Sequence, residues 1–174
     1  MNSMGPVNNA LYMLFHFQTP HLKAFLLAIF MLLGNALAGE RITHRAYVVD
    51  ATGQKSLAQI AGENATPYTG VLSRGYTDAA IWIKLDIAPP VGAKADDDIV
   101  LRIRPVYLDE ISLFDPLDTR GRTRTVGDAL PTNANEFTSL SHTFVVPAGD
   151  QPRSIWLRVK TTSTCLVNVE ALSR

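Results

Sequence analysis

Hydrophobic and polar positions alternate strictly over residues 81–87, with aliphatic residues on one side and Trp82 and Lys84 on the other. Because successive side chains of a β-strand point to opposite faces, this pattern predicts a strand with one face in a core. Residues 155–160 repeat the arrangement, with Trp156 in the same place as Trp82. Both stretches therefore place a tryptophan next to a cation on a face that is expected to meet solvent.

Similar alternation recurs along most of the chain. The predicted strands are residues 42–50, 81–87, 99–104, 107–114, 122–126, 142–146, 155–160 and 165–170. One short helix is expected over residues 56–61, with Ser56 as its N-cap. Residues 64–75 and 127–140 are expected to be loops, since they are rich in Gly, Pro and small polar residues. Many short strands with almost no helix are typical of an antiparallel, jelly-roll-like β-sandwich.

The first 38 residues have the pattern of a signal peptide. Lys23 precedes an apolar run over residues 24–33, and the small-x-small sequence of residues 36–38 follows it. The run is shorter than the roughly 20 apolar residues of a membrane span. We therefore expect residues 1–38 to be a cleaved signal peptide and residues 39–174 to be one exported, periplasmic domain. An uncleaved N-terminal anchor is the alternative.

Composition narrows the class of protein. The chain has 174 residues, of which 47% are hydrophobic, and this length suits one globular domain. Its formal net charge is zero, which gives no general electrostatic reason to bind nucleic acid. The single cysteine, Cys165, cannot form an intramolecular disulfide, and its strand parity places it in the core.

Residues that could perform catalysis or bind a metal are scattered. His44 and His142 lack the spacing of a metal-binding pair, and Asp109 and Glu110 are adjacent, so they face opposite ways on a strand. The acidic run at residues 96–98 is typical of a solvated turn, although calcium binding is an alternative. No nucleophile elbow or phosphate-binding loop is present in the sequence. We therefore predict no catalytic residue, no metal and no cofactor.

The outward faces of the strands supply the remaining candidate site. If their strands share one sheet, six outward residues would form an aromatic and cationic ligand-binding surface. These residues are Trp82, Lys84, Arg102, Arg104, Trp156 and Arg158. Indole rings pack on the apolar faces of sugars, and guanidinium groups bind carboxylate or phosphate. Two alternatives remain: a structural cation–π ladder covered by residues 127–140, or a protein–protein surface.

An ordered set of motifs resembles a known sensory domain. It comprises Ser-Leu-x-x-Ile at residues 56–60, Ile-Trp-Ile-Lys-Leu-Asp-Ile at 81–87, Val-Leu-Arg-Ile-Arg-Pro at 100–105, Leu-Asp-Glu-Ile-Ser-Leu-Phe at 108–114, Gly-Asp-Ala-Leu-Pro at 127–131 and Ser-Ile-Trp-Leu-Arg-Val-Lys-Thr at 154–161. The set resembles the periplasmic sensory domain of the bacterial seven-transmembrane receptors with diverse intracellular signalling modules. The resemblance implies a jelly-roll-like sandwich that binds carbohydrate-type or other small ligands. It also implies seven membrane helices downstream and a cytoplasmic output, commonly a histidine kinase or a diguanylate cyclase.

Two features depart from this family pattern. Such domains usually have an arginine shortly after the Gly-Asp-x-x-Pro element, and residues 132–140 contain none. The sequence also ends at Arg174 without membrane helices, so we expect a truncated receptor, a gene fragment or a detached sensor. The expected function is periplasmic sensing of a small ligand, in which this chain meets a membrane only through the missing helices. The alternatives are a free-standing carbohydrate-binding module and a protein-interaction sandwich, and the sequence predicts no particular oligomeric state.

Overall fold

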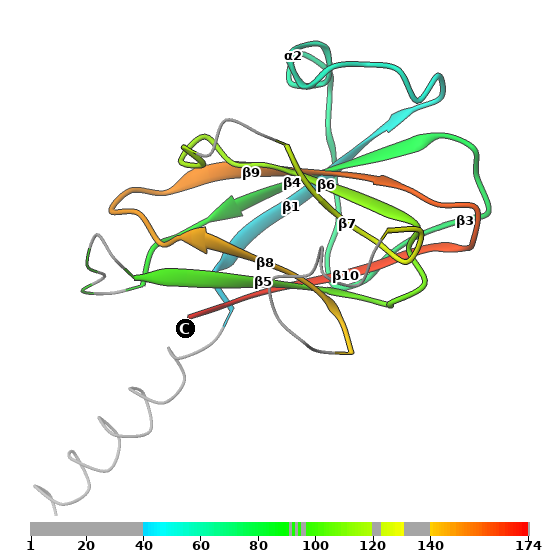
Figure 1. Ribbon diagram of the computed structural model, residues 1–174. Helices are drawn as coiled ribbons and strands as arrows, with labels where there is room; N and C mark the ends of the chain where they lie inside the picture. Colours follow the sequence, from blue (N-terminus) through cyan, green and yellow to red (C-terminus); the bar gives the residue numbers. More distant parts are fainter. Residues whose placement is uncertain are drawn as a thin grey trace, which may run out of the picture. The chain divides into compact units, whose positions relative to one another are not determined.

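The computed structural model describes residues 40–90, 92, 94, 97–119, 123–130 and 140–173 (Figure 1). Its elements are β1 (Ile42–Asp50), α2 (Leu57–Ile60), β2 (Thr66–Pro67), β3 (Leu72–Gly75), β4 (Ala80–Ile87), β5 (Asp98–Arg104), β6 (Glu110–Phe114), β7 (Arg124–Val126), β8 (His142–Pro147), β9 (Arg153–Lys160) and β10 (Cys165–Ser173). Strands dominate the described residues, and α2 is a single helical turn. The all-β prediction with one short helix near the start is confirmed.

The strands form two antiparallel sheets that lie one over the other, with α2 beyond the larger sheet (Figure 1). The six-stranded sheet has the order β2-β1-β4-β9-β6-β7, and the four-stranded sheet has the order β3-β10-β5-β8. This arrangement confirms the predicted β-sandwich. The jelly-roll winding stays a prediction.

The core lies between the sheets, where the alternating aliphatic residues meet. The inward residues of β4, Ile81, Ile83, Leu85 and Ile87, are at most 1% exposed. Leu101 of β5 is cross-strand from Phe144 of β8, and both are buried in the opposite wall of the same core. Removal of this apolar surface from water is the main favourable contribution to folding. Cys165 is also buried in the core, as its parity predicts, and burial raises the pKa of its thiol.

The prediction of a loop over residues 64–75 is wrong, because the segment contributes β2 and β3. Pro67, Gly70 and Gly75 gave the signals of a turn-rich loop. Both strands are short edge strands, and only Leu72 of β3 is buried. A four-residue strand with one inward residue has too little alternation to be recognised from sequence.

Other local predictions are confirmed in part. The segment over residues 122–126 contains β7, which is an edge strand as expected. The helix is shorter than residues 56–61, and Ser56 is its N-cap, where the Gln59 side chain reaches back and its Oε1 accepts a hydrogen bond from the Ser56 N–H at 2.8 Å. Of the expected loop over 127–140, residues 131–139 lie outside the described part of the chain. Gly127 begins this loop against the β5–β6 connection, where a Cβ atom would lie 2.0 Å from the carbonyl oxygen of Asp109.

Three arginines connect the two sheets by donating to backbone carbonyls. Arg45 of β1 donates to Val169 O of β10 at 3.1 Å, and Arg124 of β7 donates to Val145 O of β8 at 2.8 Å. Arg153 of β9 donates to Ala148 O, just after β8, at 2.7 Å. Because guanidinium has five donors in a rigid plane, one side chain can satisfy carbonyls and a carboxylate together. These contacts are direct polar links between the two sheets.

Candidate functional site

Trp82 and Trp156 lie on neighbouring strands and share the outer face of the six-stranded sheet. Strands β4 and β9 pair so that Trp82 is cross-strand from Arg158, and Lys84 is cross-strand from Trp156. The condition that the two tryptophan–cation strands share one sheet is therefore met for these four residues, and ligand binding by them stays a prediction.

Arg102 and Arg104 lie elsewhere, so the expectation of a single six-residue surface is wrong. Both belong to β5 in the four-stranded sheet. They bind Glu170 of β10, with Arg102 Nε 2.6 Å from Oε2 and Arg104 Nη2 2.8 Å from Oε1. Strand parity identified their outward face correctly, but parity does not say to which sheet a strand belongs.

Trp82 faces outward from the sandwich but is only 2% exposed. It packs in a second, smaller apolar cluster with Val48, Ile60 and Trp156, and its ring centroid lies 5.2 Å from that of Phe114. Ile60 comes from α2, so the crossover between β1 and β2 covers the indole. The described covering segment is thus residues 51–65. The structural alternative named residues 127–140 as the cover, and residues 131–139 of that loop lie outside the described part of the chain.

Arg158 holds the covering segment onto the sheet. Its Nη1 donates to Glu110 Oε1 at 2.8 Å, and its Nη2 donates to the Gly53 carbonyl at 2.9 Å. Asp50 shapes the same turn by accepting hydrogen bonds from Thr52 and from the Lys55 N–H. Burial acts to raise the pKa of Asp50, but these hydrogen bonds outweigh it and hold the pKa below its usual value. The described contacts of Arg158 are therefore structural ones.

Two clefts flank Trp156 on this outer face, each with a volume of about 440 Å³. The first, the Phe114 cleft, is lined by Leu57, Leu113, Phe114, Asp115, Pro116, Asp118, Thr123, Ser154 and Trp156. The second, the Lys84 cleft, is lined by Ala61, Glu63, Asn64, Ala65, Lys84, Ser154 and Trp156. Ser154 and Trp156 belong to both linings. Of the six predicted site residues, Lys84 and Trp156 line these clefts.

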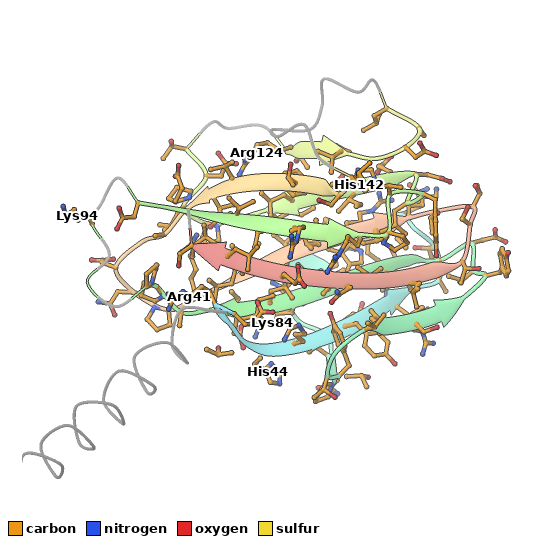
Figure 2. All side chains as sticks on the ribbon, turned by 90° about the horizontal axis from the view of Figure 1, so that it is seen from below. Arg41, His44, Lys84, Lys94, Arg124 and His142 are labelled. Carbon is orange, nitrogen blue, oxygen red and sulfur yellow. The ribbon has the colours of Figure 1, made fainter. Side chains whose placement is uncertain are left out.

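Asp86 organises the polar side of this surface. Its Oδ1 accepts a hydrogen bond from Ser154 Oγ at 2.6 Å and lies 3.6 Å from Lys84 Nζ. Its Oδ2 lies 3.4 Å from His44 Nδ1. His44 and Lys84 project from β1 and β4 on the same side of the domain (Figure 2). The result is an indole next to a hydroxyl, a carboxylate and an ammonium group.

Sequence reasoning missed several residues of these clefts. Ser154 and Asp86 share the outward parity of Trp156 and Lys84, so strand alternation was a signal that could have added them to the predicted site. Phe114 was predicted in a strand, but its neighbour Trp156 could not be known without the pairing of β6 with β9. No feature of the hydrophobic pattern indicated that residues between 57 and 65 line these clefts, because a connection between strands can fold over either face of a sheet.

A third cleft of about 430 Å³ lies where residues 127–130 meet the β9–β10 turn. It is lined by Asp78, Asp109, Glu110, Ala129, Leu130, Lys160, Thr161 and Thr162. Asp109 Oδ2 accepts hydrogen bonds from the Thr162 N–H at 2.6 Å and from Thr162 Oγ1 at 2.7 Å. These bonds hold the pKa of Asp109 below its usual value, so the carboxylate serves to fix the turn.

None of the helices in the described part of the chain has the length and apolar character of a membrane span. Among the same residues, no group of three or more His, Cys, Asp or Glu side chains is placed to hold a metal ion.

Comparison with known proteins places the chain in a family. The family model described as 7TMR-DISM extracellular 2 matches residues 43–173, which includes all the described strands except Ile42, the first residue of β1. A search of curated proteins gave no match.

Proposed function

The chain belongs to the 7TMR-DISM extracellular 2 family, a sensory domain of transmembrane receptors on the outer side of the membrane, and on this premise we propose that it binds a small molecule of carbohydrate type beside Trp156. The observation that carries the proposal is that both clefts share Trp156 and Ser154. An indole offers an apolar surface to a sugar ring, and hydroxyl and charged groups beside it can bind the ring hydroxyls. The proposal therefore keeps Lys84 and Trp156 as ligand contacts.

The other four predicted residues have different roles in this proposal. Trp82 supports the floor of the site from beneath α2, and Arg158 anchors the covering segment. Arg102 and Arg104 lie on the other sheet and do not contribute to this site. A ligand acts as a signal only if it binds one arrangement of the domain better than another, which then biases the attached membrane helices.

Calorimetric titration tests binding directly. The purified domain would be titrated with a panel of neutral monosaccharides and disaccharides, sugar acids and small organic acids. We expect at least one compound to bind and Trp156→Leu to weaken that binding about tenfold or more, because tryptophan is enriched among the contacts whose truncation costs about 2 kcal/mol or more. Ser154→Ala, which keeps the apolar cluster intact, should weaken it as well.

Arg104→Met is the control, since Arg104 lies on the opposite sheet, and circular dichroism verifies that each variant is folded. If no compound on the panel binds, ligand sensing by this face is rejected. If a compound binds equally to the wild type and to both site variants, the site is wrong.

A reading frame with seven apolar spans directly downstream of the codon for Arg174 would support coupling to a receptor, whereas its absence would favour a free-standing carbohydrate-binding module.

A further inference from the structure

In the Lys84 cleft, the ammonium of Lys84 has no acidic partner within hydrogen-bond distance among the described residues. Lys84 Nζ lies 3.6 Å from Asp86 Oδ1, which is longer than an N–H···O hydrogen bond of about 2.7–3.2 Å. Among the described residues, its ammonium has no nearer acidic neighbour. The Lys84 side chain is 33% exposed and lines the cleft, so it can meet a ligand there. The ammonium therefore has donor capacity that the fold does not use.

The acidic groups around the cleft are already engaged. Asp86 accepts the short hydrogen bond from Ser154 with one oxygen and faces His44 with the other. Glu63, the acidic residue of the cleft lining, binds Lys55 Nζ at 2.5 Å. A ligand cation would have to compete with these partners for a carboxylate. A ligand anion would meet the ammonium of Lys84 without displacing a strong contact.

The remaining lining suits the rest of a sugar. Asn64 is exposed at the cleft and carries both a donor and an acceptor, and Ser154 adds a hydroxyl group. Trp156 supplies the apolar part of the lining together with Ala61 and Ala65. A ring with hydroxyl groups and one carboxylate would use all three kinds of group. A neutral sugar would give the ammonium of Lys84 no anionic partner, so the ammonium would rely on water to solvate its charge.

We propose that the Lys84 cleft selects a carboxylate-bearing sugar, such as a hexuronic acid, with Lys84 as the residue that recognises its carboxylate. This inference rests on the proposed function, because it assigns a ligand class to the same site. A charge-assisted hydrogen bond is about twice as strong as a neutral one, and it is strengthened where side chains exclude part of the water. The site therefore discriminates by charge between sugars of otherwise similar shape.

Matched ligand pairs test the proposal: D-glucuronate against D-glucose, and D-galacturonate against D-galactose, titrated calorimetrically at low salt. We expect the acidic member of at least one pair to bind about tenfold more tightly to the wild-type protein. Lys84→Met should remove this preference, and Lys84→Arg should keep it. Lys94→Met is the matched control, because Lys94 is an exposed lysine on a loop away from Lys84 (Figure 2).

Each outcome separates this proposal from the proposed function. If the acidic and neutral members of both pairs bind equally, or if Lys84→Met retains the preference, selection by Lys84 is overturned while binding beside Trp156 stands. If Lys94→Met abolishes the preference as fully as Lys84→Met, the effect is one of net charge and the proposal is also overturned. If none of the four sugars binds, charge selection is overturned, and the wider ligand panel with Trp156→Leu decides the proposed function.

Discussion

At the scale of single residues, burial decides which arginine–carboxylate pairs matter to stability. Arg153 binds Asp115 through two parallel hydrogen bonds of 2.9 Å, and the two side chains are 8% and 0% exposed. Arg104 binds Glu170 at 2.8 Å, but these side chains are 46% and 24% exposed. Water screens the second pair and solvates either partner if the other is lost. The Arg153–Asp115 pair is buried, so water would not solvate one partner if the other were lost.

Arg153→Met should therefore lower the free energy of unfolding by about 3–5 kcal/mol, because it leaves the carboxylate of Asp115 buried and unpaired. Arg104→Met should lower it by less than about 1 kcal/mol. Urea unfolding at neutral pH, followed by tryptophan fluorescence, measures both changes. Equal losses in the two variants would show that burial of the pair does not set its contribution.

At the scale of elements, α2 is too short to be stable by itself, and its role is to cover the tryptophans. A single helical turn gains little from its own hydrogen bonds, so packing must stabilise it. Ile60 is completely buried against Trp82 and Trp156. Arg158 adds one polar tie, from its guanidinium to Gly53 O. The side chain of Ile60 is thus one of the apolar contacts that shield Trp82 from water.

Ile60→Ala should increase acrylamide quenching of the native protein's tryptophan fluorescence and cost about 2–4 kcal/mol of stability. Ile99→Ala is the control, because Ile99 is also fully buried but lies in the main core between the sheets. It should cost a similar amount of stability and leave native-state quenching unchanged. Equal quenching in the two variants would mean that α2 does not protect the indoles.

The strands and the segment around Trp82 show which features of the fold the sequence could predict and which it could not. Alternation identified the inward residues of β4 and β9 correctly, because each face of a long strand is set by its own residues. It could not identify which strands are neighbours, and so it grouped Arg102 with Trp82 across two different sheets. It also could not show that residues 51–65 fold over Trp82, since that depends on contacts distant in the sequence.

At the scale of the whole molecule, Glu40 and Arg41, the first residues that the structure describes, contact the last strand. Glu40 Oε1 accepts a hydrogen bond from the Ala171 N–H at 2.9 Å, and Glu40 Oε2 lies 2.9 Å from Arg45 Nη2. The Arg41 N–H donates to Ala171 O at 3.0 Å. These contacts join the first described residues to β10. Cleavage between Ala38 and Gly39 would therefore leave every described contact of the sandwich in place.

We expect the exported protein to begin at Gly39, because the residues at the first and third positions before the cut, Ala38 and Ala36, are small, as a signal peptidase requires. Ala38→Leu should block this cleavage and keep the apolar run over residues 24–33 attached. Leu37→Ala is the control, since the position between the two alanines carries no such requirement. Intact-mass measurement and N-terminal sequencing of the periplasmic fraction give the start of the chain. A periplasmic protein that retains residues 1–38, or an Ala38→Leu variant that is still cut at Gly39, would contradict cleavage at this site.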